Sequence, residues 1–414
     1  MATRTQTDFY AGKIIENVVS YDRSSSYPDV QVNCKYPIGE FYHSGHIEYD
    51  ELLHIIDDRE HAVIMQIALT DVELHEIWFG CPYLSKDKCR NIKNALYDNG
   101  RILEAEYLET TITDIDLKII LKEYDFDDIY VIDSWHTKYG YLPESMREVD
   151  RDYYNRKTEL KGVEGQEVYY MKSKNKLNSV YGMSAQDPVK QDIIFDPLTL
   201  DFKEGEEDEE KILQKYEKKA FLPYQWGVWT TAWARYRLHE GIWIAGQNFI
   251  YCDTDSVKFI DDMAIRSHFD CYNANRIKDS TFNRALATDK HGEIHYMGVY
   301  EHDDSYLKFK TLGAKKYCYI TEDGKLHITI AGVNKRKGAE ELEEYNGIES
   351  FEPGFLFVKG GGTESVYNDI PDVKSLTFEG RKIPITSNVS ILDSTYRLGI
   401  TGEYERLLKN LPVI

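Results

Sequence analysis

Two apolar segments, Phe249–Cys252 and Val257–Ile260, flank the sequence Asp253-Thr254-Asp255-Ser256. Short apolar segments joined by turn-forming residues are typical of a β-hairpin whose strands are buried in a sheet. The hairpin would bring Asp253 and Asp255 together at its tip, where both carboxylates can bind one divalent cation. Oxygen ligands suit Mg²⁺, which binds few protein carboxylates and keeps water or phosphate oxygens. Turn acids that are simply solvated have the same pattern, so this segment alone leaves both interpretations open.

The rest of the chain mixes helix and strand patterns. Val18–Asp22 predicts a strand that ends at a carboxylate, and the alternation after His61 predicts another strand. Residues 147–181 predict two helices separated near two glycines, and 225–241 predict a third helix. The chain has 414 residues without an internal repeat or a long linker, so we expect an α+β fold with interleaved domains.

The charge is unevenly distributed along the chain. In total 50 Lys and Arg oppose 71 Asp and Glu, a formal net charge of −21. Residues 151–182 nevertheless carry seven basic and four acidic side chains, and residues 305–338 carry eight and two. Basic segments in an acidic chain favour a channel for a polyanion, although chance clustering on solvated helices is the alternative. The six acids among the seven residues 204–210 predict a solvated face or loop.

The cysteine pattern and the apolar segments indicate the cellular compartment in which we expect the protein. The six cysteines form neither a Cys-x-x-Cys pair nor a zinc-binding pattern, which favours free thiols in a reducing environment. No run of 18 apolar residues and no signal peptide is present. We therefore expect a cytoplasmic protein with no membrane partner.

Three longer motifs occur in order along the chain. Asp22-Arg23-Ser24-Ser25-Ser26-Tyr27-Pro28 resembles DxxSLYP, motif A of the family B DNA polymerases, with Ser in place of the usual Leu. Lys174–Gly182 resembles motif B, KxxxNSxYG, and Tyr251–Ser256 matches motif C, YxDTDS. Lys315-Lys316-Tyr317 resembles the KxY motif that follows. The chain is therefore similar to a family B DNA polymerase.

The protein-primed, bacteriophage-type branch is the most similar part of that family. Tyr10-Ala11-Gly12-Lys13 resembles the YxG(G/A) element of that branch, although Lys13 departs from its last position. The 75 residues from Asn178 to Asp253 suggest an insertion, and Phe351–Phe355 resembles the approach to a small thumb. If the chain is viral, the expected compartment is the host cytoplasm.

The resemblance implies a right-hand architecture, with an antiparallel-sheet palm, helical fingers and a small thumb. Only 21 residues precede Asp22, fewer than a proofreading exonuclease needs, so we expect a polymerase core without that domain. The expected parts are an N-terminal lead (1–20), palm (21–150), fingers (151–186), loop insertion (187–221), second palm segment (222–353) and thumb (354–414). In the insertion, we expect Phe195, Leu198, Leu200 and Phe202 to anchor an acidic tip that faces solvent or a basic partner.

The resemblance also implies the reaction, which is the addition of deoxynucleotides to a primer 3′ end on a DNA template. Asp22 and Asp255 would bridge two Mg²⁺ ions, for which Mn²⁺ can substitute. Asp253 would support the metals more loosely, and Arg23 would contribute its backbone carbonyl. Lys174 would face the triphosphate and protonate the leaving pyrophosphate.

Further contacts follow from the same resemblance. Tyr27 would lie under the incoming sugar and exclude a 2′-hydroxyl. The expected nucleotide-binding residues are Tyr27, Arg23, Asn178, Tyr181, Lys157 and Lys161. The expected DNA-binding residues are Lys315, Tyr317, Tyr10, Gly12, Ser179, Gly182 and Thr254. The expected partners are primer-template DNA and deoxynucleotides, together with a separate exonuclease, terminal protein or processivity factor.

Two other functions share part of this pattern. A DxD glycosyltransferase also binds a nucleotide diphosphate through a metal, but it requires neither the NSxYG helix nor KxY. A catalytically inactive homologue would have lost acids, whereas Asp22, Asp253 and Asp255 are all present. The sequence leaves open what primes synthesis.

Overall fold

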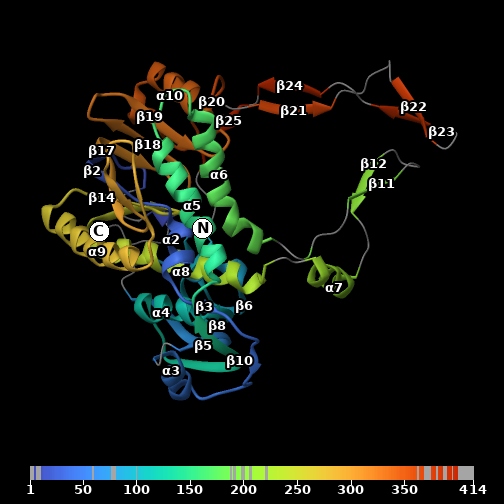
Figure 1. Cartoon of the computed structure of the whole chain (residues 1–414). Coiled ribbons are helices and arrows are strands. Elements are labelled where there is room, and N and C mark those ends of the chain that lie inside the picture. Colours follow the sequence, from blue (N-terminus) through green and yellow to red (C-terminus); the bar gives the residue numbers. More distant parts are fainter. Residues whose placement is uncertain are drawn as a thin grey trace.

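The computed structural model has an α+β fold (Figure 1), as expected from the sequence. It describes residues 4–5, 11–57, 60–75, 81–98, 100–186, 189, 193–196, 201–204, 208–219, 222–360, 363–367, 374–378, 381–385, 389–393 and 395–399. Within these ranges, no helix combines the length and apolar character that crossing a membrane requires.

A seven-stranded antiparallel sheet forms the centre of the molecule. In spatial order, its strands are β1 (Arg4–Thr5), β13 (Phe249–Asp253), β14 (Ser256–Ile260), β2 (Ile15–Arg23), β17 (Tyr300–Thr311), β18 (Lys316–Thr321) and β19 (Leu326–Ile330). The expected hairpin is confirmed as β13–β14, and the expected strand near Val18 is confirmed as β2.

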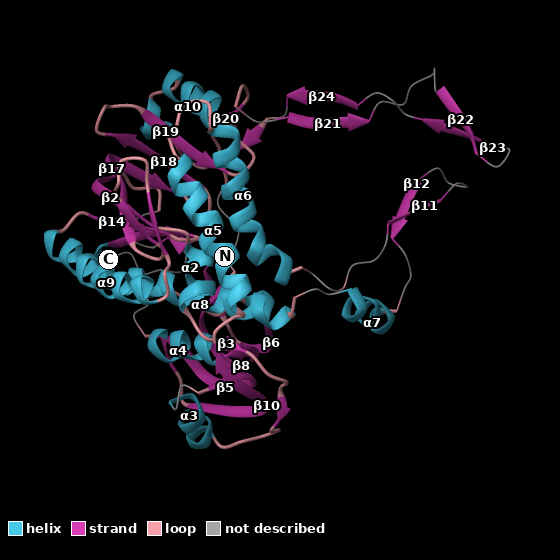
Figure 2. Cartoon of the chain, viewed as in Figure 1, coloured by secondary structure: helices cyan, strands magenta, loops and turns pink. Residues whose placement is uncertain are grey.

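Alternation along β2 gives this sheet two different faces. Val19 and Tyr21 point to one side, where they pack with Phe259 and Phe269. Helices α8 (Tyr224–Ala245) and α9 (Met263–Phe282) lie against that face (Figure 2). Val18 points to the other face, among the aromatic side chains of β13 and β17.

The seven-stranded sheet is strongly curved. The rings of Tyr251 on β13 and Tyr317 on β18 lie 5.0 Å apart, although three strands separate β13 from β18. Neighbouring strands lie about 4.8 Å apart, so a flat sheet would hold these rings far from each other. The face that carries Tyr251 is therefore concave.

A second, eight-stranded antiparallel sheet lies within residues 36–140. Its strands are β3 (Tyr36–Pro37), β4 (Tyr42–His43), β5 (His61–Leu74), β6 (Cys89–Lys93), β7 (Leu96–Asp98), β8 (Arg101–Thr113), β9 (Tyr124–Asp125) and β10 (Asp128–Gly140). Helices α3 (Tyr49–Asp57) and α4 (Asp114–Glu123) pack on its apolar face, where the alternate residues Val63, Met65, Ile67 and Leu69 of β5 are buried. Helix α8 contacts α4, which packs on the eight-stranded sheet, and β14 of the seven-stranded sheet, so it connects the two sheets. It also contacts the short helix α2 (Ser26–Asn33).

Two long helices, α5 (Glu144–Leu160) and α6 (Glu167–Ser184), lie side by side next to the seven-stranded sheet (Figure 1). The turn between them contains Gly162 and Gly165, whose φ angles of +68° and +77° suit glycine. The expected break between two helices is therefore confirmed. The hairpin of β15 (Leu286–Thr288) and β16 (Ile294–Tyr296) packs against α5.

The remaining elements are short. They are β11 (Ile193–Asp196), β12 (Asp201–Glu204), α7 (Glu209–Lys219), α10 (Lys335–Glu344), β20 (Leu356–Phe357), β21 (Thr363–Tyr367), β22 (Lys374–Phe378), β23 (Arg381–Ile385), β24 (Val389–Asp393) and β25 (Tyr396–Arg397).

The expected loop insertion contains regular structure. Glu204 ends β12 and Glu209 begins α7, where acids in the first turn interact favourably with the helix dipole. Phe195 and Phe202 pair across β11 and β12. Leu198 and Leu200 lie outside the described residues.

Candidate active site

Strand pairing brings the three motif acids to one end of the seven-stranded sheet. In the strand register, Ser256 of β14 pairs with both Asp22 of β2 and Asp253 of β13. The Arg23 amide donates to the Asp255 carbonyl at 2.9 Å, which fixes the hairpin tip against the end of β2. The Asp255 amide donates to the Asp253 carbonyl at 2.7 Å and closes the turn. Asp22 of β2, Asp253 of β13 and Asp255 of the β13–β14 turn are therefore gathered at one end of the sheet.

These carboxylates are half-buried and disfavour one another's ionised forms. Burial raises the pKa of Asp22 to about 7, with further contributions from Asp255 and Asp303. Burial also raises the pKa of Asp255 to about 6, although Arg23 opposes this shift. Clustered carboxylates of this kind are stabilised by a cation, and their hard oxygen atoms match the ligands that Mg²⁺ prefers. The donor set therefore fits a magnesium site.

The side chain of Arg23 is buried in the protein interior and stabilises the fold there, instead of contributing to the candidate metal site. Its guanidinium is 1% exposed, forms an ion pair with Asp29 of α2 and donates to Ser26 Oγ at 2.9 Å. Gly298, with φ +77°, lies against the same carboxylate, where an added Cβ would be only 2.3 Å from Asp29. This buried guanidinium leaves only the backbone carbonyl of Arg23 for a metal or a nucleotide.

Replacing Arg23 with Met should lower the free energy of unfolding by about 3–5 kcal/mol, because Asp29 would remain buried without its cation. Urea denaturation followed by circular dichroism measures this loss. The double variant Arg23→Met/Asp29→Leu removes both charges, so its free energy of unfolding should fall less than that of the single variant. Equal decreases in the single and double variants would contradict the importance of this ion pair.

Three lysines of the α5–α6 pair lie together opposite the acids. Lys157 Nζ donates to Ser25 Oγ at 2.9 Å. Burial lowers the pKa of Lys157, and the neighbouring Lys174 and Lys161 lower it further. The charge of Lys157 in turn lowers the pKa of Asp255. The arrangement provides a cluster of cations next to the candidate metal site, as a bound triphosphate would require.

Two tyrosines from different motifs form a stack beside the acids. The rings of Tyr27 on α2 and Tyr181 on α6 have centroids 4.4 Å apart and an interplanar angle of 10°. Burial, followed by the proximity of Tyr181, raises the pKa of Tyr27 to about 12. Asn178, one turn before Tyr181 on α6, is exposed. Motifs A and B are therefore in direct contact through these rings.

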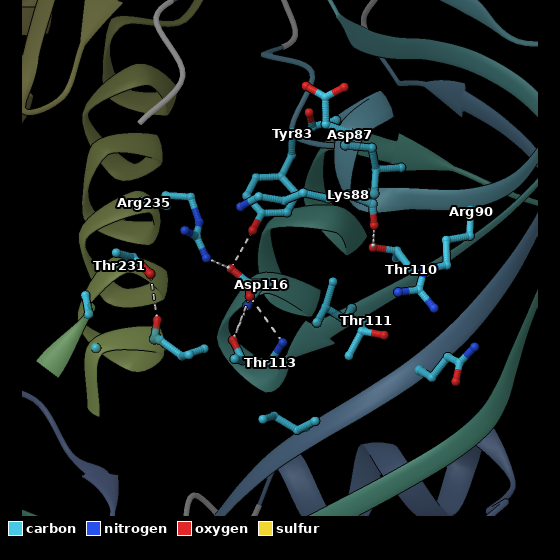
Figure 3. Close-up of a pocket in the computed structure, with 18 of the residues that line it drawn as sticks. Tyr83, Asp87, Lys88, Arg90, Thr110, Thr111, Thr113, Asp116, Thr231 and Arg235 are labelled. Carbon is cyan, nitrogen blue, oxygen red and sulfur yellow. Dashed lines mark hydrogen bonds and ion pairs between the residues drawn. The ribbon is translucent and has the colours of Figure 1, made fainter. Parts of the chain in front are cut away.

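The stacked tyrosines line one part of a cavity of about 730 Å³. Most of its other lining residues come from β8, α8 and the segment before β6, and α4 contributes Asp116 (Figure 3). Arg235 of α8 points toward α4, where its Nη2 donates to Asp116 Oδ1 at 2.8 Å. The basic side chains that line the cavity are Lys88, Arg90, Arg101 and Arg235. They belong to none of the motifs, so sequence analysis missed them.

The KxY residues contact the tip of the β13–β14 hairpin. Lys315 Nζ lies 2.7 Å and 3.0 Å from the two carboxylate oxygens of Asp253. The Lys315 amide donates to the Tyr251 hydroxyl at 3.0 Å, and Tyr317 packs on the Tyr251 ring. Asp253 is therefore already paired with a cation, whereas Asp22 and Asp255 form no ion pair among the described residues.

The other expected DNA-binding residues are more dispersed. The Gly12 amide donates to the Thr311 carbonyl at 2.8 Å, at the end of β17 that precedes KxY. Thr254 Oγ1 donates to Asp253 at 3.0 Å, and Ser179 Oγ donates to the Asn175 carbonyl at 2.7 Å. Gly182 is exposed on α6. Tyr10 lies outside the described residues.

Residues 3–258 match the family model described as DNA polymerase type B, organellar and viral. The DNA polymerase of Bacillus phage Nf is 25% identical over 327 residues, which cover 77% of this chain and 49% of that protein. The DNA polymerase of Bacillus phage B103 is 27% identical over 256 residues, or 60% of this chain and 40% of that protein. The chain thus spans about half the length of these relatives.

Solved structures have a similar fold. Phi29 DNA polymerase in an orthorhombic crystal form matches with a TM-score of 0.66 at 20% identity, over 96% of this chain and 61% of that one. Phi29 DNA polymerase complexed with primer-template DNA and incoming nucleotide substrates matches with a TM-score of 0.63 at 20% identity. This match covers 94% of this chain and 59% of that one. These matches indicate a shared fold.

Proposed function

Because this chain belongs to the organellar and viral type B DNA polymerases, we propose that it adds deoxynucleotides to a primer 3′ end as directed by a DNA template. The bacteriophage branch expected from the motifs is confirmed by the Bacillus phage relatives. One observation carries the proposal, namely the meeting of Asp22, Asp253 and Asp255 beside a cluster of lysines.

The proposed chemistry is a two-metal phosphoryl transfer. Asp22 and Asp255, with looser support from Asp253 and the Arg23 carbonyl, would hold two Mg²⁺ ions. When bound, the ions lower the pKa of the primer hydroxyl and stabilise charge on the leaving pyrophosphate. Binding of the metals would replace the repulsion between Asp22 and Asp255 with attraction, which favours a tight site.

The lysine cluster and the tyrosine stack would bind the incoming nucleotide. Lys157, Lys161 and Lys174 would neutralise the triphosphate, and Lys174 would also donate a proton to the pyrophosphate. Tyr27 would pack under the sugar. Asn178 and Tyr181 would line the new base pair. Since Tyr27 and Tyr181 stack on each other, a nucleotide that enters between them must separate the rings.

The DNA would be bound on both sides of the acids. Lys315 and Tyr317 would contact the primer strand, because they lie against the hairpin tip. The basic cavity beside Tyr27 and Tyr181 is a suitable position for the template strand, whose phosphates Lys88 and Arg90 would neutralise. Base pairing would determine the sequence, so we expect binding that depends on salt but tolerates any template.

The proposed right-hand architecture follows from these roles. The seven-stranded sheet with α8 and α9 would be the palm, and α5 with α6 would be the fingers. Residues from 354 onward would form the thumb. The eight-stranded sheet lies within the segment 21–150 that we assign to the palm, but it has its own core.

Primer extension with purified protein tests the function. Mg²⁺-dependent addition of the templated deoxynucleotide would support it, and no extension of any primed template would contradict it. Transfer of a sugar from a nucleotide diphosphate would favour the glycosyltransferase alternative. We also propose that these 414 residues carry no proofreading activity, because the motifs recognised in them belong to the polymerase reaction. Removal of a mismatched primer 3′ end by the same sample would contradict this second proposal.

Deleting residues 203–211 should leave the addition of a single nucleotide unchanged, because no proposed metal or triphosphate ligand lies there. If the insertion contributes to processivity, as the resemblance implies, the deletion should shorten products on a singly primed circle and weaken strand displacement. A variant that keeps the length but replaces the six acids with amides separates charge from length. Products of unchanged length at single-turnover enzyme levels would indicate a solvated segment instead.

A further inference from the structure

Lys258 is a buried cation in the middle of the seven-stranded sheet, directly behind the candidate metal site. Its neighbours Val257 and Phe259 pack against α8 and α9, so alternation along β14 turns Lys258 to the concave face. The residue is only 4% exposed. The sequence offered one signal, a lysine in an otherwise apolar strand, but no motif includes it.

Neutral groups hold the Lys258 ammonium in place. Lys258 Nζ donates to Ser20 Oγ at 3.0 Å, across the strand register from β14 to β2. It also lies 3.5 Å from Ser256 Oγ and 5.6 Å from the centre of the Tyr317 ring. No carboxylate of the described residues lies within ion-pair distance of this nitrogen. Its charge is therefore balanced only at longer range.

The groups that balance this charge are the acids of three neighbouring strands. Burial lowers the pKa of Lys258, whereas Asp303 of β17, Asp22 of β2 and Asp253 of β13 raise it. The effect is mutual, because the Lys258 charge also lowers the pKa of Asp22. Other cations near these acids are Lys315, which contacts Asp253 on the exposed side of the hairpin tip, and Lys157 of α5, which interacts electrostatically with Asp22. A desolvated ammonium is unfavourable unless such acids offset it.

We propose that Lys258 is a positioning residue that partly neutralises the metal-binding acids from behind and thereby weakens and adjusts their affinity for divalent ions. This inference rests on the proposed two-metal function. Lys258 lies on the same face of the sheet as Asp22, because their cross-strand partners Ser20 and Ser256 are each two residues away along the strand. Metals bound by Asp22 and the ammonium of Lys258 would therefore repel each other across the same carboxylates. Lys258 thus favours a site that does not hold its metals irreversibly.

The test measures Mn²⁺ binding to the DNA-free protein by electron paramagnetic resonance, independently of polymerase activity. Lys258→Met keeps the length of the side chain but removes the charge, and should bind Mn²⁺ at least threefold more tightly than the parent. Its melting temperature without metal should fall, and Ca²⁺ should raise that temperature more than in the parent. Lys258→Arg keeps the charge and should bind Mn²⁺ within about twofold of the parent. Lys325→Met, at the exposed β18–β19 turn, is the matched control and should have no effect.

The outcomes separate this inference from the proposed function. Unchanged Mn²⁺ affinity in Lys258→Met would overturn the inference, as would an equal change in Lys258→Arg and Lys258→Met, which would indicate packing. Lys258→Gln, whose amide can still donate to Ser20, provides the same comparison if the Met variant does not fold. If Asp22→Ala leaves Mn²⁺ binding unchanged in the parent background, the two-metal function itself fails.

Discussion

Replacing Asp22 or Asp255 with Ala is expected to reduce the rate of primer extension on the order of 10³-fold or more. Each carboxylate would help to hold the metals, so its loss would remove stabilisation of the charge that develops in the transition state. Single-turnover addition of one deoxynucleotide, at saturating primer-template and Mg²⁺, measures the effect. Glu16→Ala is a suitable control, since Glu16 is exposed on the same strand, β2, but at its other end.

Folding should be little affected by these substitutions. Burial already disfavours the ionised carboxylates of Asp22 and Asp255, as their raised pKa values indicate, so removing one relieves an unfavourable charge. Asp253→Ala should reduce the rate less, because Asp253 is paired with Lys315. Near-normal extension by folded Asp22→Ala or Asp255→Ala protein would eliminate the two-metal assignment.

Replacing Tyr27 with Val is expected to increase the use of ribonucleotides relative to deoxynucleotides on the order of 10²-fold. The ring of Tyr27 lies at the start of α2, five residues after Asp22, where a sugar 2′-hydroxyl would clash with it. The ratio of kcat/KM for the two nucleotides, measured with the same template base, gives the discrimination.

The Tyr27→Val variant needs controls because Tyr27 also stacks on Tyr181. Val at position 27 also removes a ring that packs on Tyr181, which could weaken the binding of both nucleotides equally. Tyr27→Phe keeps the ring and should keep the discrimination. Tyr181→Phe should likewise leave the ratio unchanged. If Tyr27→Val discriminates as well as the parent, Tyr27 does not act on the sugar.

Local elements were predictable because their signals lie within a few residues. The hairpin around Asp253 and Asp255 combines two apolar segments with a polar turn, and the α5–α6 break coincides with two glycines of positive φ. The resemblance to the family motifs predicted that Asp22 belongs with these acids. The structure brings them together through the pairing of β2 with β14.

Long-range packing was not predictable from these patterns. Tyr36 of β3 pairs with Gly140 of β10, about a hundred residues later, and nothing local specifies that partner. The curvature that brings Tyr317 to Tyr251 depends on the whole sheet. The contact between Lys315 and Asp253 requires β18 to be in place in the sheet, and the buried position of Lys258 requires β2. Local patterns therefore could not predict either feature.

Helix α6 carries Lys174 and Tyr181 on a single rigid body. Seven residues of α-helix span about 10.5 Å, and no glycine or proline lies between these two positions. A movement of α6 that separates Tyr181 from Tyr27 must therefore also displace Lys174. In the proposed roles, a mispaired base that pushes Tyr181 aside would withdraw the proton donor from the pyrophosphate. Selection of the correct base and commitment to the chemical step would then be one mechanical event, and accuracy would not require a separate checking step before bond formation.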